Sequence, residues 1–131
     1  MSACPCHSEK KYASCCEPFH AGQAWPETAE ALMRSRYSAY VLRKIDYLLK
    51  TRHPRHQETK ERENIEKWAN AVVFYKLEIL NCSQGKVQDK TGKVEFKAHY
   101  KLNGEDGLIH ERSRFKRYQG HWSYWDGEML N

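Results

Sequence analysis

The sequence predicts an α+β domain preceded by a cysteine-rich segment, and three observations lead to this prediction. The 131-residue chain places four of its five cysteines within residues 4–16. Apolar residues then recur at three- and four-residue spacing from Thr28 onward, which is typical of helices. From Val72 onward apolar and polar residues alternate, which is typical of strands. Helices followed by consecutive strands with short turns indicate helices packed on an antiparallel sheet.

Three helices are expected before the strands. The first begins after Thr28, because a threonine side chain can cap the free amide groups of a helix N-terminus. A second, short helix is expected over residues 45–49, ending near Pro54, since the residue before a proline disfavours helical backbone. A third and highly charged helix is expected from about residue 58 to residue 68.

Four strands are expected after the helices, joined in sequence order by short turns. Turn-forming residues stand at 103–107 and at 119–120, and they divide the second half of the chain into hairpins. Asp126 and Gly127 are predicted to form a terminal turn. The expected strands cover residues 72–82, 94–102, 108–118 and 121–126.

Composition limits the class of protein. Hydrophobic residues make up 40% of the chain and charged residues 30%, as in soluble globular domains. There is no run of 18 apolar residues and no basic N-terminal region followed by an apolar stretch. We therefore expect a cytoplasmic protein without membrane insertion. It would consist of a metal-binding segment at 1–23 and one domain at 24–131.

Cys4, Cys6, Cys15 and Cys16 form the most specific motif in the chain. Zinc takes four soft donors at tetrahedral angles, and two close cysteine pairs separated by eight residues supply them. Disulfides and an accidental cluster are the alternatives; the odd number of cysteines argues against a fully paired disulfide framework. Since four sulfurs leave no open position on the ion, we predict structural Zn²⁺.

The segment Cys-Pro-Cys-x-Ser-x-Lys-Lys-Tyr-x-x-Cys-Cys resembles the SEC-C zinc motif found at the C-terminal end of the SecA translocation ATPase. The resemblance implies that these cysteines bind zinc and that the segment contacts a protein or a ribosome. His7, Glu9 and Glu17 stand where that motif commonly has glycine, which permits positive φ in tight turns. His7 is also a competing candidate ligand.

Further segments resemble the YchJ-like bacterial family: residues 28–40, 47–51, 110–115 and 122–127. Together they span nearly the whole chain. This resemblance implies a cone-shaped nuclear-transport-factor-2-like (cystatin-like) domain, in which a curved antiparallel sheet wraps around helices. Relatives of that fold hold small molecules in the cone, and some are isomerases or dehydratases. It implies no particular reaction for this chain.

Arg36, Glu111 and Ser113 stand where periodicity predicts apolar contacts. Arg36 falls in the middle of the apolar stripe of the first helix, and the other two share a strand face with apolar residues. Buried charges are costly unless they are paired, so the simplest prediction is that Arg36 and Glu111 meet inside the cone. The functional interpretation is a ligand or catalytic pocket; the alternative is a structural ion pair.

Further pocket candidates are aromatic or titratable side chains near the same face. His53 is a candidate general base, although a histidine at that position often only caps a helix end. Cys82 is expected to be an ordinary strand residue, and of Trp122 and Trp125 one is expected to be packed. The other candidates are Tyr37, Tyr40, Tyr124 and Asp126.

The chain carries a formal net charge of +5. Arg112, Arg114 and Lys116 share one strand face and predict a positive stripe that would attract phosphate, as in ribosomal RNA. The alternative is a solvated face balanced by glutamates of residues 58–66. Zn²⁺ with four thiolates would lower the charge to about +3. No nucleic-acid-binding signature appears in the sequence, so nucleic acid remains an open alternative.

Overall fold

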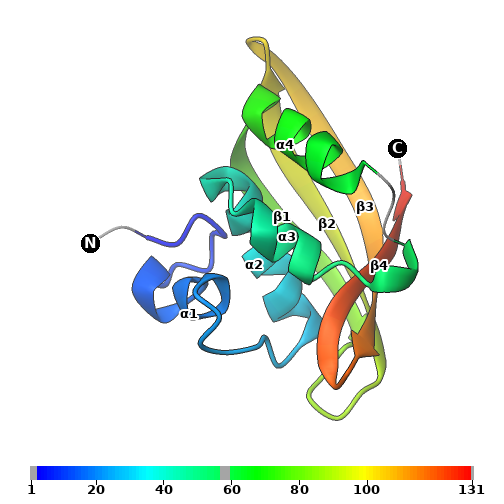
Figure 1. The fold of residues 1–131 in the computed structure, drawn as a ribbon. Coiled ribbons are helices and arrows are strands. Elements are labelled where there is room, and N and C mark those ends of the chain that lie inside the picture. The colour runs from blue at the N-terminus through cyan, green and yellow to red at the C-terminus, as the bar shows by residue number, and fades with distance from the viewer. Residues whose placement is uncertain (1–2, 57–59, 131) are drawn as a thin grey trace.

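The computed structural model describes residues 3–56 and 60–130. Figure 1 shows helices on one face of a curved sheet, with the N-terminal segment beside α2 and the sheet on the other side of that helix. The elements, in chain order, are the short helices η1 (Tyr12–Ser14) and α1 (Glu17–His20), then α2 (Ala29–Leu42), α3 (Ile45–Lys50), η2 (Pro54–His56) and α4 (Glu61–Ala71), followed by β1 (Val72–Gln84), β2 (Thr91–Leu102), β3 (Glu105–Tyr118) and β4 (His121–Met129).

The helices follow the sequence prediction closely. The side chain of Thr28 accepts a hydrogen bond from the amide of Ala31 over 3.1 Å, which caps the N-terminus of α2 as expected. The helix ends where Arg43 adopts left-handed backbone, with φ 57°. The third of the expected helices is α4, which begins at Glu61 rather than near residue 58. Residues 57–59 lie outside the described residues.

The four strands form one antiparallel sheet in the order β1-β2-β3-β4. Two-residue turns join β2 to β3 and β3 to β4, and both residues of each turn have positive φ: Asn103 with Gly104, and Gln119 with Gly120. This conformation matches the twist of hairpin strands, so the strands continue up to the turns. β3 therefore begins earlier than expected, at Glu105. β2 also begins earlier than expected, at Thr91, and β1 and β4 end later than expected, at Gln84 and Met129.

The predicted terminal turn at Asp126 and Gly127 is wrong. Both residues lie inside β4, where Gly127 pairs with Ser113 and Asp126 pairs with Arg114 on β3. Because these pairs extend the ladder, β4 reaches the middle of β3. Gly127 therefore lies beside Ser113, one of the predicted pocket residues.

The core has two parts. The larger lies between α2 and the sheet and includes Leu32, Phe96, Phe115 and Trp122, while Trp125 is only partly buried. The smaller lies among α2, α3 and α4 and includes Ala39, Tyr47, Leu48 and Ile65. No helix in residues 3–56 and 60–130 is long and apolar enough to cross a membrane.

Candidate metal centre and cavity

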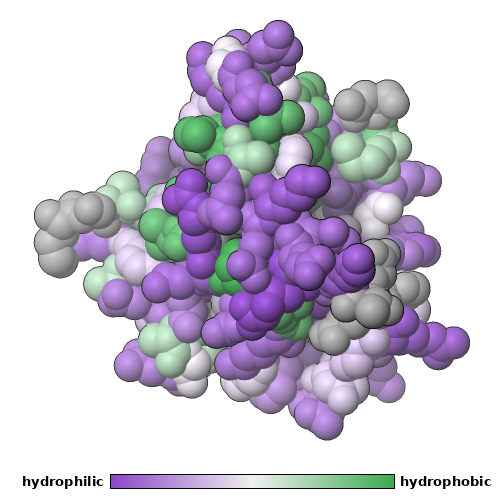
Figure 2. Space-filling view, turned by 45° about the horizontal axis from the view of Figure 1, so that its top comes forward, coloured by the Kyte–Doolittle hydropathy of each residue, from purple (hydrophilic) through white to green (hydrophobic). Residues whose placement is uncertain are grey.

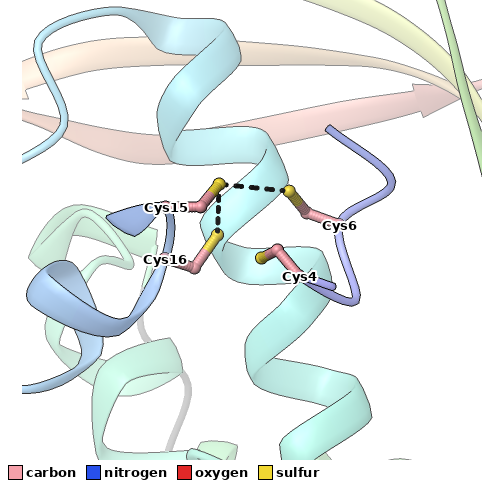
Figure 3. A group of neighbouring side chains, drawn as sticks. All are labelled: Cys4, Cys6, Cys15 and Cys16. Atoms are coloured by element: carbon pink, nitrogen blue, oxygen red, sulfur yellow. Dashed lines mark hydrogen bonds between the residues drawn. The ribbon is translucent and has the colours of Figure 1, made fainter. Parts of the chain in front are cut away.

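The four N-terminal cysteines converge on one point. Cys4 and Cys6 come from the first loop and Cys15 and Cys16 from the turn after η1, and their side chains point toward one another (Figure 3). All four Sγ atoms lie within 4.8 Å of one another. The Sγ atoms of Cys6 and Cys15 are 3.6 Å apart, and those of Cys15 and Cys16 are 3.9 Å apart.

These distances fit a zinc ion. Four sulfurs at the usual Zn–S distance of about 2.3 Å form a tetrahedron whose edges are about 3.8 Å. Hydrogen bonding with Cys16 lowers the pKa of Cys6, whereas burial raises the pKa of Cys4 and hydrogen bonding with Cys6 raises that of Cys16. A bound cation would favour the thiolate form of all four cysteines. Bound zinc would cross-link the two cysteine pairs, and four thiolates would leave no position for a substrate.

The loop around the cysteines adopts strained backbone. His7 and Glu9 have φ of 64° and 69°, the left-handed conformation that glycine adopts most easily. These are two of the three positions where the sequence replaces a common glycine; the third, Glu17, starts the short helix α1 instead. The ring of His7 lies 3.4 Å from the Tyr37 hydroxyl and is not part of the four-cysteine cluster.

The cysteine-rich segment is anchored to the domain through α2. Arg34 donates a hydrogen bond to the carbonyl oxygen of Cys6 over 2.9 Å. His20 donates from Nε2 to the carbonyl oxygen of Ser35 over 2.9 Å and accepts from the Tyr12 hydroxyl at Nδ1 over 2.7 Å. Burial lowers the pKa of His20, which favours the neutral ring that this arrangement needs.

Three of the cysteines also belong to the larger core cluster of the domain. Cys4, Cys6 and Cys16 are buried, with exposures of 4%, 0% and 1%, and they pack with Leu32 and Tyr37 of α2. A segment with almost no aliphatic residues is thus held in place by packing of its cysteines on α2 and by the clustering of their sulfur atoms.

A cavity of about 190 Å³ lies between α2 and the sheet. Six of the predicted pocket residues contribute to its lining, together with six apolar side chains. The polar or hydroxyl-bearing residues are Arg36, Tyr37, Tyr40, Glu111, Ser113 and Tyr124. The apolar residues are Met33, Trp68, Phe74, Phe96, Ala98 and Ile109.

Arg36 is buried at one side of this cavity, with 7% of its surface exposed. Its Nη1 donates to the carbonyl oxygen of Leu48 over 2.9 Å and to the hydroxyl of Thr51 over 2.6 Å. Both acceptors are neutral. Burial lowers the pKa of Arg36, which reflects the cost of a buried cation.

The expected ion pair between Arg36 and Glu111 is not formed, so that prediction is wrong. The ion pairs within residues 3–56 and 60–130 do not include either residue. Instead, Tyr124 contacts both: its hydroxyl donates to Glu111 Oε2 over 3.0 Å, and its ring lies 4.9 Å from the guanidinium of Arg36. Ser113 also donates to Glu111 Oε2. Burial and the nearby Glu111 raise the pKa of Tyr124, so its hydroxyl stays protonated.

Two other pocket candidates lie elsewhere. The ring of His53 packs edge-on against Trp125 and Tyr118, with centroids 4.7 and 5.3 Å apart, and the cavity lining in the described residues does not include it. Asp126 forms an ion pair with Arg114 on the face of the sheet opposite Ser113. Cys82 is an exposed strand residue, as expected, 3.5 Å from Glu30.

The predicted positive stripe on β3 is largely neutralised by its neighbours. Arg112 lies 3.2 Å from Glu128 and 3.6 Å from Glu95, while Arg114 pairs with the aspartate on β4. Lys116 lies over the ring of Trp125. Little unpaired charge remains there to attract phosphate. Figure 2 shows a face covered mostly by hydrophilic residues, with hydrophobic residues in separate small areas.

Several groups that shape the cavity have no signal in the sequence. Thr51 and the carbonyl oxygen of Leu48, both on or next to α3, hold Arg36 in place. Trp68 of α4 and Phe74 of β1 complete the apolar lining. The pairing of α3 with Arg36 depends on how helices cross, which the apolar spacing within one helix does not reveal.

Two parts of the chain match models of known families. Residues 28–127 match the model of the YchJ middle NTF2-like domain. The chain belongs to the YchJ-like family. Residues 2–18 match the SEC-C motif, in agreement with the cysteine cluster. The predicted α+β, NTF2-like fold with an N-terminal cysteine knuckle is thereby confirmed.

Relatives of this YchJ-like protein extend over nearly its whole length. A UPF0225 protein of Actinobacillus succinogenes is 43% identical over 96% of this chain and 81% of its own. A UPF0225 protein of Streptomyces coelicolor is also 43% identical, over 98% of this chain and 96% of its own.

Solved structures share the fold. A SEC-C motif containing protein from Rhodopseudomonas palustris matches with a TM-score of 0.88 and 34% identity, covering 98% of both chains. A second, from Psychrobacter arcticus, matches with a TM-score of 0.77 and 32% identity, over 98% of this chain and 80% of its own. An LEH-like epoxide hydrolase of M. tuberculosis matches with a TM-score of 0.52 at 12% identity, covering 77% of this chain and 85% of its own, which concerns the fold alone.

Proposed function

We propose that this YchJ-like protein binds a small molecule in the cavity between α2 and the sheet. The observation that carries the proposal is a buried arginine, Arg36, in the wall of a largely apolar cavity of about 190 Å³. An apolar cavity of about 150 Å³ is enough to bind benzene, so this volume suits a molecule of about one ring. Nucleotides and larger cofactors would need several times that space.

Zinc has a structural role in this proposal. The cysteine knuckle packs on α2, the helix that carries Arg36 and Tyr37 into the cavity wall. Because four thiolates close the coordination of the ion, the metal would stabilise the helix that forms the binding site and would not contact the ligand.

Turnover of the bound molecule would be of the isomerase or dehydratase type. Glu111 is a proton acceptor in the cavity wall, and the protonated hydroxyl of Tyr124 lies beside it. A carboxylate in the cavity wall can abstract a proton from a bound molecule, and the hydrogen bond from Tyr124 would orient that carboxylate. Solvent deuterium appearing in a recovered ligand would be the sign of this chemistry.

The binding test uses NMR with single-ring probes of different charge: benzoate, benzamide, benzyl alcohol and benzylamine. At least one probe should shift the methyl signals of Ala98 and Ile109, which line the cavity. Ala98→Leu should abolish the shifts by filling the space, whereas Ala71→Leu, at an exposed position of α4, should not. If no probe shifts these signals, the proposed function is wrong.

A second candidate function is a protein or ribosome contact through the knuckle. It is favoured by Lys10 and Lys11, adjacent exposed lysines on the loop between the two cysteine pairs. The test is co-sedimentation of the zinc-loaded protein with purified ribosomes. Lys10→Glu with Lys11→Glu should abolish sedimentation, whereas Lys86→Glu with Lys90→Glu, at exposed positions between β1 and β2, should not. Equal sedimentation of both variants would contradict this candidate.

A further inference from the structure

Arg36 lacks an anionic partner within residues 3–56 and 60–130, although it is buried in the cavity wall. A buried guanidinium without a carboxylate is costly, because neutral acceptors do not replace the charge lost with water. Among the described residues, Arg36 donates hydrogen bonds only from Nη1, to the carbonyl oxygen of Leu48 and the hydroxyl of Thr51. Its Nε and Nη2 have no protein acceptor in that part of the chain, while the side chain lines the cavity.

The free N–H groups on Nε and Nη2 lie on one edge of the guanidinium, and the geometry of this edge matches one chemical group. Carboxylates accept two parallel hydrogen bonds from such an edge, with charge on both partners. The two neutral acceptors of Nη1 fix the plane of the guanidinium but do not compensate its positive charge. The arginine is therefore held in position for an acidic group that the protein itself does not supply.

The rest of the cavity limits what that acid can carry. Apolar side chains, among them Phe74, Phe96 and Ile109, form most of the remaining wall. They would not compensate a second charge or the extended polar surface of a sugar or nucleotide. The volume of about 190 Å³ leaves room for about one ring beside the carboxylate.

Glu111 sets the orientation of an acid bound in the cavity. Its Oε2 already accepts hydrogen bonds from Tyr124 and Ser113, and Gly127 lies so close that an added Cβ would overlap this carboxylate. A ligand carboxylate at this end would meet like charge, whereas at the Arg36 end it would meet opposite charge. A bound acid would accordingly direct its acidic group toward Arg36.

We propose that the cavity binds small monocarboxylic acids with a compact apolar body of about one ring, and that Arg36 holds the carboxylate. This inference rests on the proposed function and names the class of ligand. Charge-assisted hydrogen bonds are about twice as strong as neutral ones. The acid should therefore bind at least about tenfold more tightly than its neutral amide.

The experiment compares benzoate, benzamide and benzylamine by NMR titration of the zinc-loaded protein. Benzoate should bind at least about tenfold more tightly than benzamide, and benzylamine weakest. Arg36→Met should reduce the affinity for benzoate to the level of benzamide. Arg36→Lys should give an intermediate affinity, because lysine keeps the positive charge but lacks the two parallel N–H donors of the guanidinium. Arg43→Met, an exposed position just after α2, should leave both affinities unchanged.

The outcomes separate the two proposals. If benzamide binds as tightly as benzoate, or benzylamine binds more tightly, the carboxylate inference is wrong and the binding function stands. If all three probes and benzyl alcohol fail to bind, both are wrong. Zinc content and amide NMR dispersion check the fold of each variant. Should Arg36→Met not fold, the wild-type comparison of benzoate with benzamide decides by itself.

Discussion

Tyr124 donates its hydroxyl hydrogen to Oε2 of Glu111 over 3.0 Å, and this bond fixes the acidic end of the cavity. The same ring lies 4.9 Å from the guanidinium of Arg36. One tyrosine therefore contacts both charged groups and takes the place of a direct ion pair. The two charges stay in the cavity wall, available to a ligand, instead of neutralising each other.

Tyr124→Phe should lower the free energy of unfolding by about 1–2 kcal/mol, because a partly buried carboxylate loses one of its donors while the ring is kept. Urea unfolding of the zinc-loaded protein measures the change. Tyr118→Phe is the matched control, since that hydroxyl is on an exposed side chain, and it should change the free energy by less than about 0.5 kcal/mol. Equal effects of the two substitutions would show that the Glu111 contact contributes nothing.

Gly127→Ala should destabilise the protein by about 1–3 kcal/mol, because the new methyl group overlaps the Glu111 carboxylate and stands 2.7 Å from the Tyr124 hydroxyl. The cost should fall when Glu111→Ala is combined with it, since the overlap with the carboxylate is then removed and only the approach to Tyr124 remains. A double-mutant cycle measured by urea unfolding gives this coupling. Additive effects would contradict the close approach.

Cys16→Ser should remove zinc and lower the melting temperature, because in a four-cysteine zinc site its buried sulfur would supply one of the ligands and the remaining three thiolates would bind less tightly. Elemental analysis should find one zinc per wild-type chain and much less in this variant. Cys82→Ser is the control, since this cysteine is exposed and outside the cluster, and it should keep the metal. Full zinc content in Cys16→Ser would contradict the four-cysteine site.

Glu9→Gly should stabilise the zinc-loaded protein by about 1 kcal/mol, because Glu9 is exposed and holds φ at 69°, where a side chain costs roughly that much. Glu17→Gly should have the opposite effect, since Glu17 begins α1 with helical backbone. Thermal unfolding in excess zinc compares them. Stabilisation by Glu17→Gly, or none by Glu9→Gly, would contradict the backbone assignment.

Features encoded locally in the sequence were predicted well. The cap at Thr28 and the spacing of apolar residues define α2, because a helix N-terminus and one helical face depend on neighbouring residues only. The four cysteines converge because two close pairs separated by a short spacer can meet at one point without contributions from the rest of the chain. Alternation along β2 and β3 likewise identified Glu111 and Ser113 as facing inward.

Features that depend on packing between elements were not predictable. Periodicity shows that Arg36 faces the core, but its acceptors come from the end of α3, and a backbone carbonyl has no sequence signature. The pairing of Arg114 with Asp126 depends on a register that shifts between Arg114 and Phe115. Single strands therefore indicated a free positive stripe, whereas neighbouring strands supply the acids.

A structure of the zinc-loaded protein crystallised with saturating benzoate tests the central claim most directly. We expect the benzoate carboxylate on Arg36, with its ring among Phe74, Phe96 and Ile109 and away from Glu111. A cavity without benzoate, or a carboxylate bound away from Arg36, would contradict it.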